Sequence, residues 1–164
     1  MIAALFPGQG SQHVGMGEFL YEAFPRAKKV FEEASDELGY DIYDLCLNGP
    51  ENKLNLTEYT QPAILTNSFA TYRVVKDMDE LKTFAGAGHS VGEYAALVAA
   101  GGLTFKDAIK LVQLRGQLMQ KSVPEGQGTM LAVLGLDREE VQKLCQWAQE
   151  QTGETPLEPA NYNS

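Results

Sequence analysis

The sequence predicts an α/β protein, because two short apolar runs alternate with longer helical patterns along its 164 residues. The first run, residues 2–6, stops at a Pro-Gly pair and is typical of a buried strand. The second run, residues 83–88, also predicts a buried strand and leads into a serine flanked by glycines. The length is sufficient for a domain with a substantial core.

The segment between the two strands has apolar residues at helical spacing. Helices are expected around 17–38, interrupted at Pro25, and around 41–47. A further helix is expected to begin with Thr60 as its N-cap and Pro62 in its first turn.

Two more helices are expected after the second strand. Residues 92–100 are apolar on every side, which indicates a helix enclosed by the rest of the domain. Thr104 with Asp107 three residues later is typical of a helix N-terminus, and this helix should run to about Lys121.

The pattern changes after the Gly-rich segment that follows Pro124. A strand at 130–134, a helix at 137–150 and a strand at about 157–162 would form one βαβ unit. We therefore expect a core domain over 1–125 and the start of a smaller subdomain over 126–164.

Composition and charge exclude several classes of protein. Apolar residues make up 44% and charged residues 21%, as in ordinary globular proteins, and the net charge is −9, which disfavours broad nucleic-acid binding. No stretch approaches the length of a membrane helix, and the N-terminal segment lacks the basic leader of a signal peptide. Cys46 and Cys145 are expected to be free thiols in a reducing cytoplasm, and no cysteine–histidine cluster suggests a metal site.

An acidic protein that binds an acidic partner needs a local basic patch. The candidates are Lys28, Lys29, Lys106, Lys110 and Lys121. Solvated helix faces are the favoured interpretation of these lysines.

The segment Gly88-His89-Ser90-Val91-Gly92 has the context of a nucleophile elbow, with a strand before it and a helix after it. The glycines are expected because a Cβ at either position would clash with neighbouring backbone. Such a turn exposes the serine hydroxyl and places the Val91 N–H at the positive end of a helix, where it could stabilise an oxyanion. The alternative is an accidental Gly-x-Ser-x-Gly in a turn.

Arg115 lies on an apolar stripe of its helix. Its neighbours at three and four positions are Leu111, Val112, Leu118 and Met119. An arginine in such a stripe needs an anion, either a carboxylate of the protein or one of a ligand. The third interpretation, in which the guanidinium extends to the surface, stays equally open.

The loop at residues 7–12 is glycine-rich and follows the first strand, at an edge where ligands approach open α/β sheets. Its glycine spacing matches neither of the common nucleotide-phosphate motifs. A further possible role of this loop is to supply a second backbone N–H that donates to an oxyanion.

Together these segments resemble the malonyl-coenzyme A: acyl carrier protein transacylases and the acyltransferase domains of fatty-acid and polyketide synthases. The matching stretches are FPGQGSQ (6–12), TQPA (60–63), GHSVGEYAAL (88–97), RGxxM (115–119) and NYNS (161–164). The resemblance implies an α/β-hydrolase-like core with the start of an inserted ferredoxin-like small subdomain, incomplete at the C-terminus.

The resemblance also implies roles for individual residues. Ser90 would be the nucleophile that carries the malonyl group, and the backbone N–H groups of Gln9 and Val91 would form the oxyanion hole. Arg115 would bind the free carboxylate of malonyl.

Further residues would line the site. Met119 and His89 would lie beside the substrate, and Asn161 would support the hydrogen bonding of the site. In the family, the general base is a histidine on a segment that follows the positions matched here, and neither His13 nor His89 corresponds to it. We therefore expect these residues to be part of a longer enzyme.

The implied reaction is a ping-pong transfer of malonyl from malonyl-CoA to the phosphopantetheine thiol of acyl carrier protein, without a metal or a permanently bound cofactor. Expected partners are acyl carrier protein and malonyl-CoA, with no nucleic acid and no membrane. Two alternatives remain: an esterase-like serine hydrolase, and a non-catalytic or complementing half that binds CoA thioesters.

Overall fold

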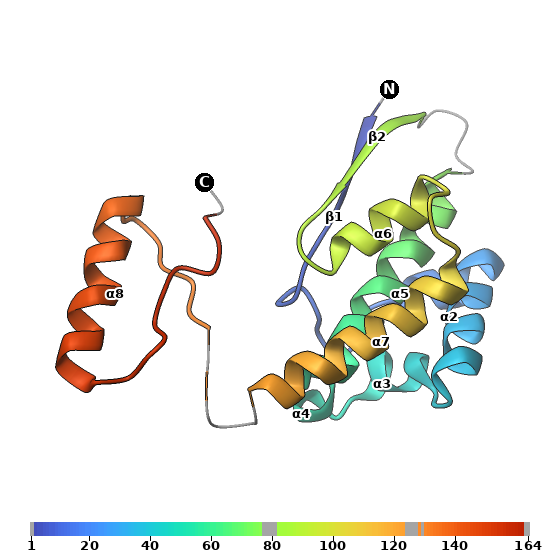
Figure 1. Cartoon of the computed structure of the whole chain (residues 1–164). Helices are drawn as coiled ribbons and strands as arrows, with labels where there is room; N and C mark the ends of the chain where they lie inside the picture. Colours follow the sequence, from blue (N-terminus) through green and yellow to red (C-terminus); the bar gives the residue numbers. More distant parts are fainter. Residues whose placement is uncertain (1, 77–81, 124–127, 129, 163–164) are drawn as a thin grey trace. The chain divides into compact units, whose positions relative to one another are not determined.

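The computed structural model describes residues 2–76, 82–123, 128 and 130–162. The chain divides into two compact units, Met1–Glu125 and Gly126–Ser164. The first unit holds both strands and most of the helices (Figure 1).

The two strands predicted for the first unit are confirmed. β1 (Ile2–Phe6) and β2 (Thr83–Gly88) pair in parallel, in a register that runs from Ile2 opposite Thr83 to Phe6 opposite Gly88. Because the strands are parallel, their carboxyl ends meet at one edge, where the glycine-rich loop and the predicted elbow both begin. Helix α6 (Gly92–Ala99) lies along one side of the pair (Figure 1).

The prediction that both strands and the following helix are enclosed is wrong for the described residues. Leu5 of β1 is 78% exposed, Phe84 of β2 is 67% exposed, and Leu97 of α6 is 50% exposed. Successive strand side chains point to opposite faces, so Phe6 is buried on the helix side while Leu5 faces outward. An apolar run predicts a strand but leaves open how many of its faces are covered.

The described residues of the first unit form six further helices: α1 (Glu18–Ala23), α2 (Pro25–Leu38), α3 (Ile42–Asn48), α4 (Glu51–Leu54), α5 (Thr57–Lys76) and α7 (Phe105–Ser122). Pro25 separates α1 from α2 as predicted, because it takes the first position of α2 after an extended Phe24. Asp41 caps α3, its carboxylate accepting the Asp44 N–H over 2.8 Å.

The predicted start of α5 at Thr60 is wrong, because the helix begins at Thr57. Thr60 lies inside the helix, where its hydroxyl donates to the carbonyl of Leu54 over 2.6 Å. Tertiary packing accounts for the extra turn: Gln120 of α7 accepts the Thr57 N–H over 3.3 Å, and Gly116 of α7 packs tightly on the same turn. Pro62 is therefore within the helix and not in its first turn.

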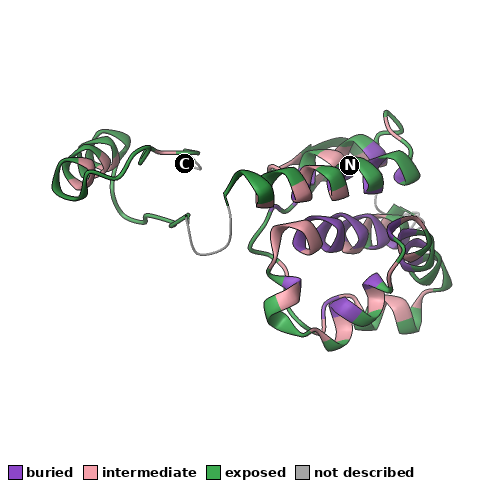
Figure 2. Ribbon diagram, turned by 60° about the horizontal axis from the view of Figure 1, so that its bottom comes forward, coloured by how far each residue is buried: buried purple, intermediate pink, exposed green. Residues whose placement is uncertain are grey.

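The core of the first unit surrounds α5, which packs against α2, α6 and α7. Buried residues gather where these helices face one another (Figure 2). Phe69 of α5 and Phe105 of α7 stack there with ring centroids 4.9 Å apart. The predicted cap of α7 is confirmed, since Thr104 Oγ1 accepts the Asp107 N–H over 3.1 Å.

The second unit contains α8 (Arg138–Thr152), which confirms the predicted helix. Asp137 and Glu140 form a capping box, and Gln149 Nε2 donates to the Leu157 carbonyl over 2.8 Å. The predicted strands at 130–134 and 157–162 are not observed in the described residues. A strand needs a hydrogen-bonded neighbour, and the described parts of these segments form no ladder.

Surface charges of the first unit pair locally. Glu37 of α2 binds Lys106 over 2.5 Å and Lys110 over 2.9 Å, and the Lys28 ammonium lies 5.2 Å from the centre of the Tyr21 ring.

Among the described helices, none combines the length and apolar character needed to cross a bilayer.

Candidate active site

The turn from β2 to α6 has the geometry of a nucleophile elbow. Its apex is Ser90, between a strand that ends at Gly88 and a helix that begins at Gly92. Ser90 has a φ of 54°, and it is the one non-glycine residue with positive φ in the described part of the chain. A side chain in this region of φ is strained and persists only where the surroundings impose it.

Close backbone packing imposes this conformation and explains the two flanking glycines. A Cβ on Gly88 would lie 2.0 Å from the carbonyl carbon of Gly92. A Cβ on Gly92 would lie 2.3 Å from the carbonyl oxygen of Phe6, at the end of β1. The predicted steric requirement for both glycines is confirmed.

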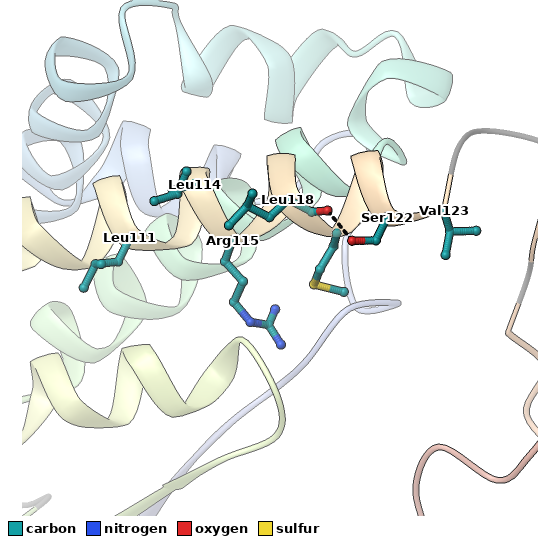
Figure 3. Close-up of a pocket in the computed structure, with 7 residues that line it drawn as sticks. Leu111, Leu114, Arg115, Leu118, Ser122 and Val123 are labelled. Atoms are coloured by element: carbon teal, nitrogen blue, oxygen red, sulfur yellow. Dashed lines mark hydrogen bonds between the residues drawn. The ribbon is translucent and has the colours of Figure 1, made fainter.

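Arg115 reaches the elbow from α7. Its Nη2 donates to the Ser90 hydroxyl oxygen over 3.0 Å, and its Nη1 donates to Gln61 Oε1 over 2.6 Å. In Figure 3 the side chain extends from α7 toward the N-terminal end of α6. Within the described residues no carboxylate pairs with this guanidinium. Of the three interpretations left open by the sequence, the one with a protein carboxylate is not observed in this part of the chain, and the half-buried guanidinium contacts Ser90 and Gln61.

Gln61 completes this contact and was assigned no role from the sequence. It is 1% exposed, and its Nε2 donates to the sulfur of Met119 over 3.1 Å. Met119 itself is partly exposed at the same place. The sequence signal that could have indicated a role for Gln61 is its position directly before Pro62 and the apolar residues that follow. A buried amide in such a segment needs hydrogen-bond partners for both its oxygen and its nitrogen.

The glycine-rich loop packs against the elbow. A Cβ on Gly8 would lie 2.5 Å from His89 Nδ1, so the two segments approach more closely than any side chain would allow. The Gln9 side chain donates to Thr57 Oγ1 over 3.2 Å, and Gln12 Nε2 donates to Asn55 Oδ1 over 2.8 Å. The loop is thereby fixed to the start of α5.

Backbone donors cluster at the start of α6. Val91 is the N-cap residue of the helix and its side chain is fully buried. The N–H groups of Gly92 and Glu93 donate to the carbonyls of His89 and Ser90 over 2.9 and 3.0 Å. The Val91 N–H precedes these two and lies at the positive end of the helix.

His89 belongs to the elbow itself, whereas His13 has no contact with Ser90 or Arg115 among the hydrogen bonds of the described residues. His89 is exposed, and its backbone N–H donates to Phe6 over 3.0 Å. No hydrogen bond joins the imidazole of His89 to Ser90 in the described part of the chain, and His13 is also exposed. Asn161 is exposed in the second unit, so its role stays a prediction.

An open depression of about 460 Å³ adjoins the Arg115 side chain (Figure 3). Its lining residues are Leu111, Leu114, Arg115, Leu118, Met119, Ser122 and Val123. Ser90 is not among these lining residues, so an acyl group that carries a carboxylate is expected where the Arg115 guanidinium meets the Ser90 hydroxyl, 3.0 Å away, at the edge of this depression.

Known proteins are similar to this chain in sequence and in fold. The malonyl CoA-acyl carrier protein transacylase of Haemophilus influenzae is 52% identical over 163 residues, which are 99% of this chain and 51% of that protein. The crystal structure of FabD from Acinetobacter baumannii matches with a TM-score of 0.89 and 49% identity, over 99% of this chain and 51% of its own. A malonyl-transacylase in complex with its type II PKS acyl-carrier protein matches with a TM-score of 0.84 and 50% identity, over 91% and 48% of the two chains.

The chain thus spans about half the length of these relatives. The acyl transferase domain family matches residues 4–153, which include the end of β1, all of β2, the elbow and Arg115. On this match, the chain belongs to the acyl transferase domain family.

Proposed function

We propose that this protein transfers a malonyl group from malonyl-CoA to the phosphopantetheine thiol of acyl carrier protein, in fatty-acid biosynthesis. The observation that carries the proposal is the Arg115 guanidinium, 3.0 Å from the Ser90 hydroxyl and without a carboxylate partner among the described residues. A half-buried arginine needs an anionic partner, and the carboxylate of a ligand can bind its planar guanidinium through two hydrogen bonds. The relatives named above, whose names specify malonyl-CoA and acyl carrier protein, support the choice of substrates.

Ser90 would act as the nucleophile. Its Oγ attacks the thioester carbonyl carbon, the new C–O bond forms, and the C–S bond to coenzyme A breaks. A general base takes the hydroxyl proton, which then goes to the departing sulfur. The phosphopantetheine thiol repeats the sequence in reverse and regenerates the free serine.

The negative charge that develops on the carbonyl oxygen needs donors in place before the reaction. The N–H groups of Val91 and Gln9 are proposed for this role, one at the start of α6 and one in the loop packed against the elbow. Met119, His89 and Asn161 are proposed to line the substrate site.

Arg115 would select among acyl groups. An acetyl group occupies the site but leaves the guanidinium without an anion, so its transition state loses one charge-assisted contact.

We also propose that no cofactor is permanently bound and that the enzyme acts in the cytoplasm. The proposed complete fold is an α/β-hydrolase-like core, beginning with residues 1–125. A ferredoxin-like insertion would begin with residues 126–164.

Intact-mass measurement tests the proposal. The protein is incubated with malonyl-CoA or acetyl-CoA, beside Ser90→Ala as the matched control. A malonyl adduct that is absent in Ser90→Ala and weaker with acetyl-CoA is expected. Turnover of simple esters with no malonyl adduct would instead indicate an esterase, and no adduct on the folded full-length protein would overturn the assignment of Ser90.

A further inference from the structure

We infer that Gln61 is a positioning residue, which holds the Arg115 guanidinium toward the acyl site and leaves its positive charge free for the carboxylate of the substrate. This inference rests on the proposed function, because it assigns the way in which that function discriminates between acyl groups. In the described part of the chain Gln61 forms no hydrogen bond with Ser90.

The Gln61 amide has both ends occupied. Its Oε1 accepts from Arg115 Nη1 over 2.6 Å, and its Nε2 donates to the Met119 sulfur over 3.1 Å. A guanidinium only donates, so the amide oxygen must be the end that faces Arg115. Because the Gln61 side chain is 1% exposed, its amide depends on these two protein partners for its hydrogen bonds.

The backbone that carries this contact is fixed as well. One residue beyond Arg115, a Cβ on Gly116 would lie 2.8 Å from both the Cα of Glu58 and the carbonyl oxygen of Thr57. Helices α5 and α7 therefore meet at backbone distance beside the Gln61–Arg115 pair. This contact fixes the distance between the backbones that carry Gln61 and Arg115. The Gln61 amide therefore holds the guanidinium in one position.

The chemistry of an amide suits this role better than that of an acid. A half-buried arginine must have acceptors, and a carboxylate would supply them while cancelling the charge. A neutral amide satisfies one donor, and the remaining donors keep the full attraction for a ligand carboxylate. The second anchored donor, on Ser90, aims the charge at the acyl position.

Two near-isosteric variants in the full-length protein test the inference. Gln61→Met removes the acceptor and keeps the volume, and Gln61→Glu keeps the acceptor but neutralises Arg115. Transfer rates with malonyl-CoA and acetyl-CoA are measured for both, together with thermal unfolding. We expect Gln61→Met to lower kcat/KM for malonyl about 10- to 100-fold, in line with the loss of a hydrogen bond to a charged group, and to change acetyl transfer far less.

Gln61→Glu should lower the malonyl preference further, because its carboxylate competes with that of the substrate. In an Arg115→Ala background, Gln61→Met should have no additional effect on the ratio of malonyl to acetyl transfer, since Gln61 acts through Arg115. This cycle separates positioning from a merely structural role, which would lower both rates and the unfolding temperature together.

Equal losses for malonyl and acetyl in both variants, or losses that add to that of Arg115→Ala, would overturn the role of Gln61 and leave the proposed function intact. If the unmodified protein transfers acetyl as well as malonyl, the proposed function fails, and the role of Gln61 fails with it. Should Gln61→Met unfold, the Gln61→Glu ratio alone decides: an unchanged malonyl preference contradicts the inference.

Discussion

Arg115 Nη2 and Ser90 Oγ are 3.0 Å apart, although the two residues belong to different elements and are 25 positions apart in the sequence. The serine is held by a turn that backbone packing forces into positive φ. The arginine is held by a helix that meets α5 at backbone distance. Both partners are therefore positioned before any ligand arrives, which is the arrangement that favours discrimination between substrates.

The first prediction concerns Arg115. Arg115→Ala should lower malonyl transfer about 100-fold and leave acetyl transfer nearly unchanged, because only malonyl offers a carboxylate to the guanidinium. Arg115→Lys keeps the charge but loses the fork that joins Gln61 to Ser90, so it should recover only part of the malonyl rate. Steady-state rates with the two CoA thioesters check this, and a uniform fall in both rates would contradict it.

The second prediction concerns the elbow glycines. Gly92→Ala should destabilise the protein by about 3 kcal/mol, since the new Cβ would overlap the Phe6 carbonyl oxygen and the strained turn cannot move. Gly102→Ala is the matched control, because its Cβ would have no neighbour closer than 3.7 Å. Urea unfolding of both variants gives the comparison, and equal stabilities would show that the elbow is more adaptable than its geometry indicates.

The elbow was predictable because its signals are local. An apolar strand, a Gly-x-Ser-x-Gly segment and a helix follow one another directly. Each glycine is required because a side chain at its position would clash with backbone close to the turn. The cap at Thr104 is local in the same way and was confirmed, and the helix predicted at 137–150 is observed as α8. Local signals failed at Thr60, where packing against α7 extends the helix by one turn.

Other features depend on partners that are distant in sequence. Gln61 and Arg115 are 54 positions apart, and no spacing rule brings an amide on one helix to a guanidinium on another. The burial of β2 and of α6 likewise depends on which elements cover their outer faces. The apolar runs alone therefore led to the wrong prediction that both are enclosed. The segments 130–134 and 157–162 have strand-like sequences, but a strand exists only with a hydrogen-bonded neighbour.

The third prediction concerns the two cysteines. Burial raises the pKa of the Cys46 thiol to about 12, and its side chain is fully enclosed. Thiol reagents attack the thiolate, so at pH 8 Cys46 should resist alkylation of the folded protein. Cys145, which is partly exposed on α8, should react first. Peptide mapping after a short exposure to iodoacetamide tests the order, with urea-unfolded protein as the control in which both thiols react; rapid labelling of folded Cys46 would contradict it.

The fourth prediction concerns the carboxylate that joins α2 to α7. Hydrogen bonds from Lys106 and Lys110 hold the pKa of the Glu37 carboxyl below its usual 4.5, so folding favours the ionised form. Glu37→Gln should therefore lower the unfolding temperature slightly near pH 7, and the difference should disappear as the pH falls below 4.5 through the lowered pKa. Glu32→Gln is the control, since Glu32 is an exposed residue of α2 without an ion pair among the described residues. Thermal unfolding from pH 7 to pH 3 gives the comparison, and a gap that persists at the acidic end would show that Glu37 acts through packing and not through charge.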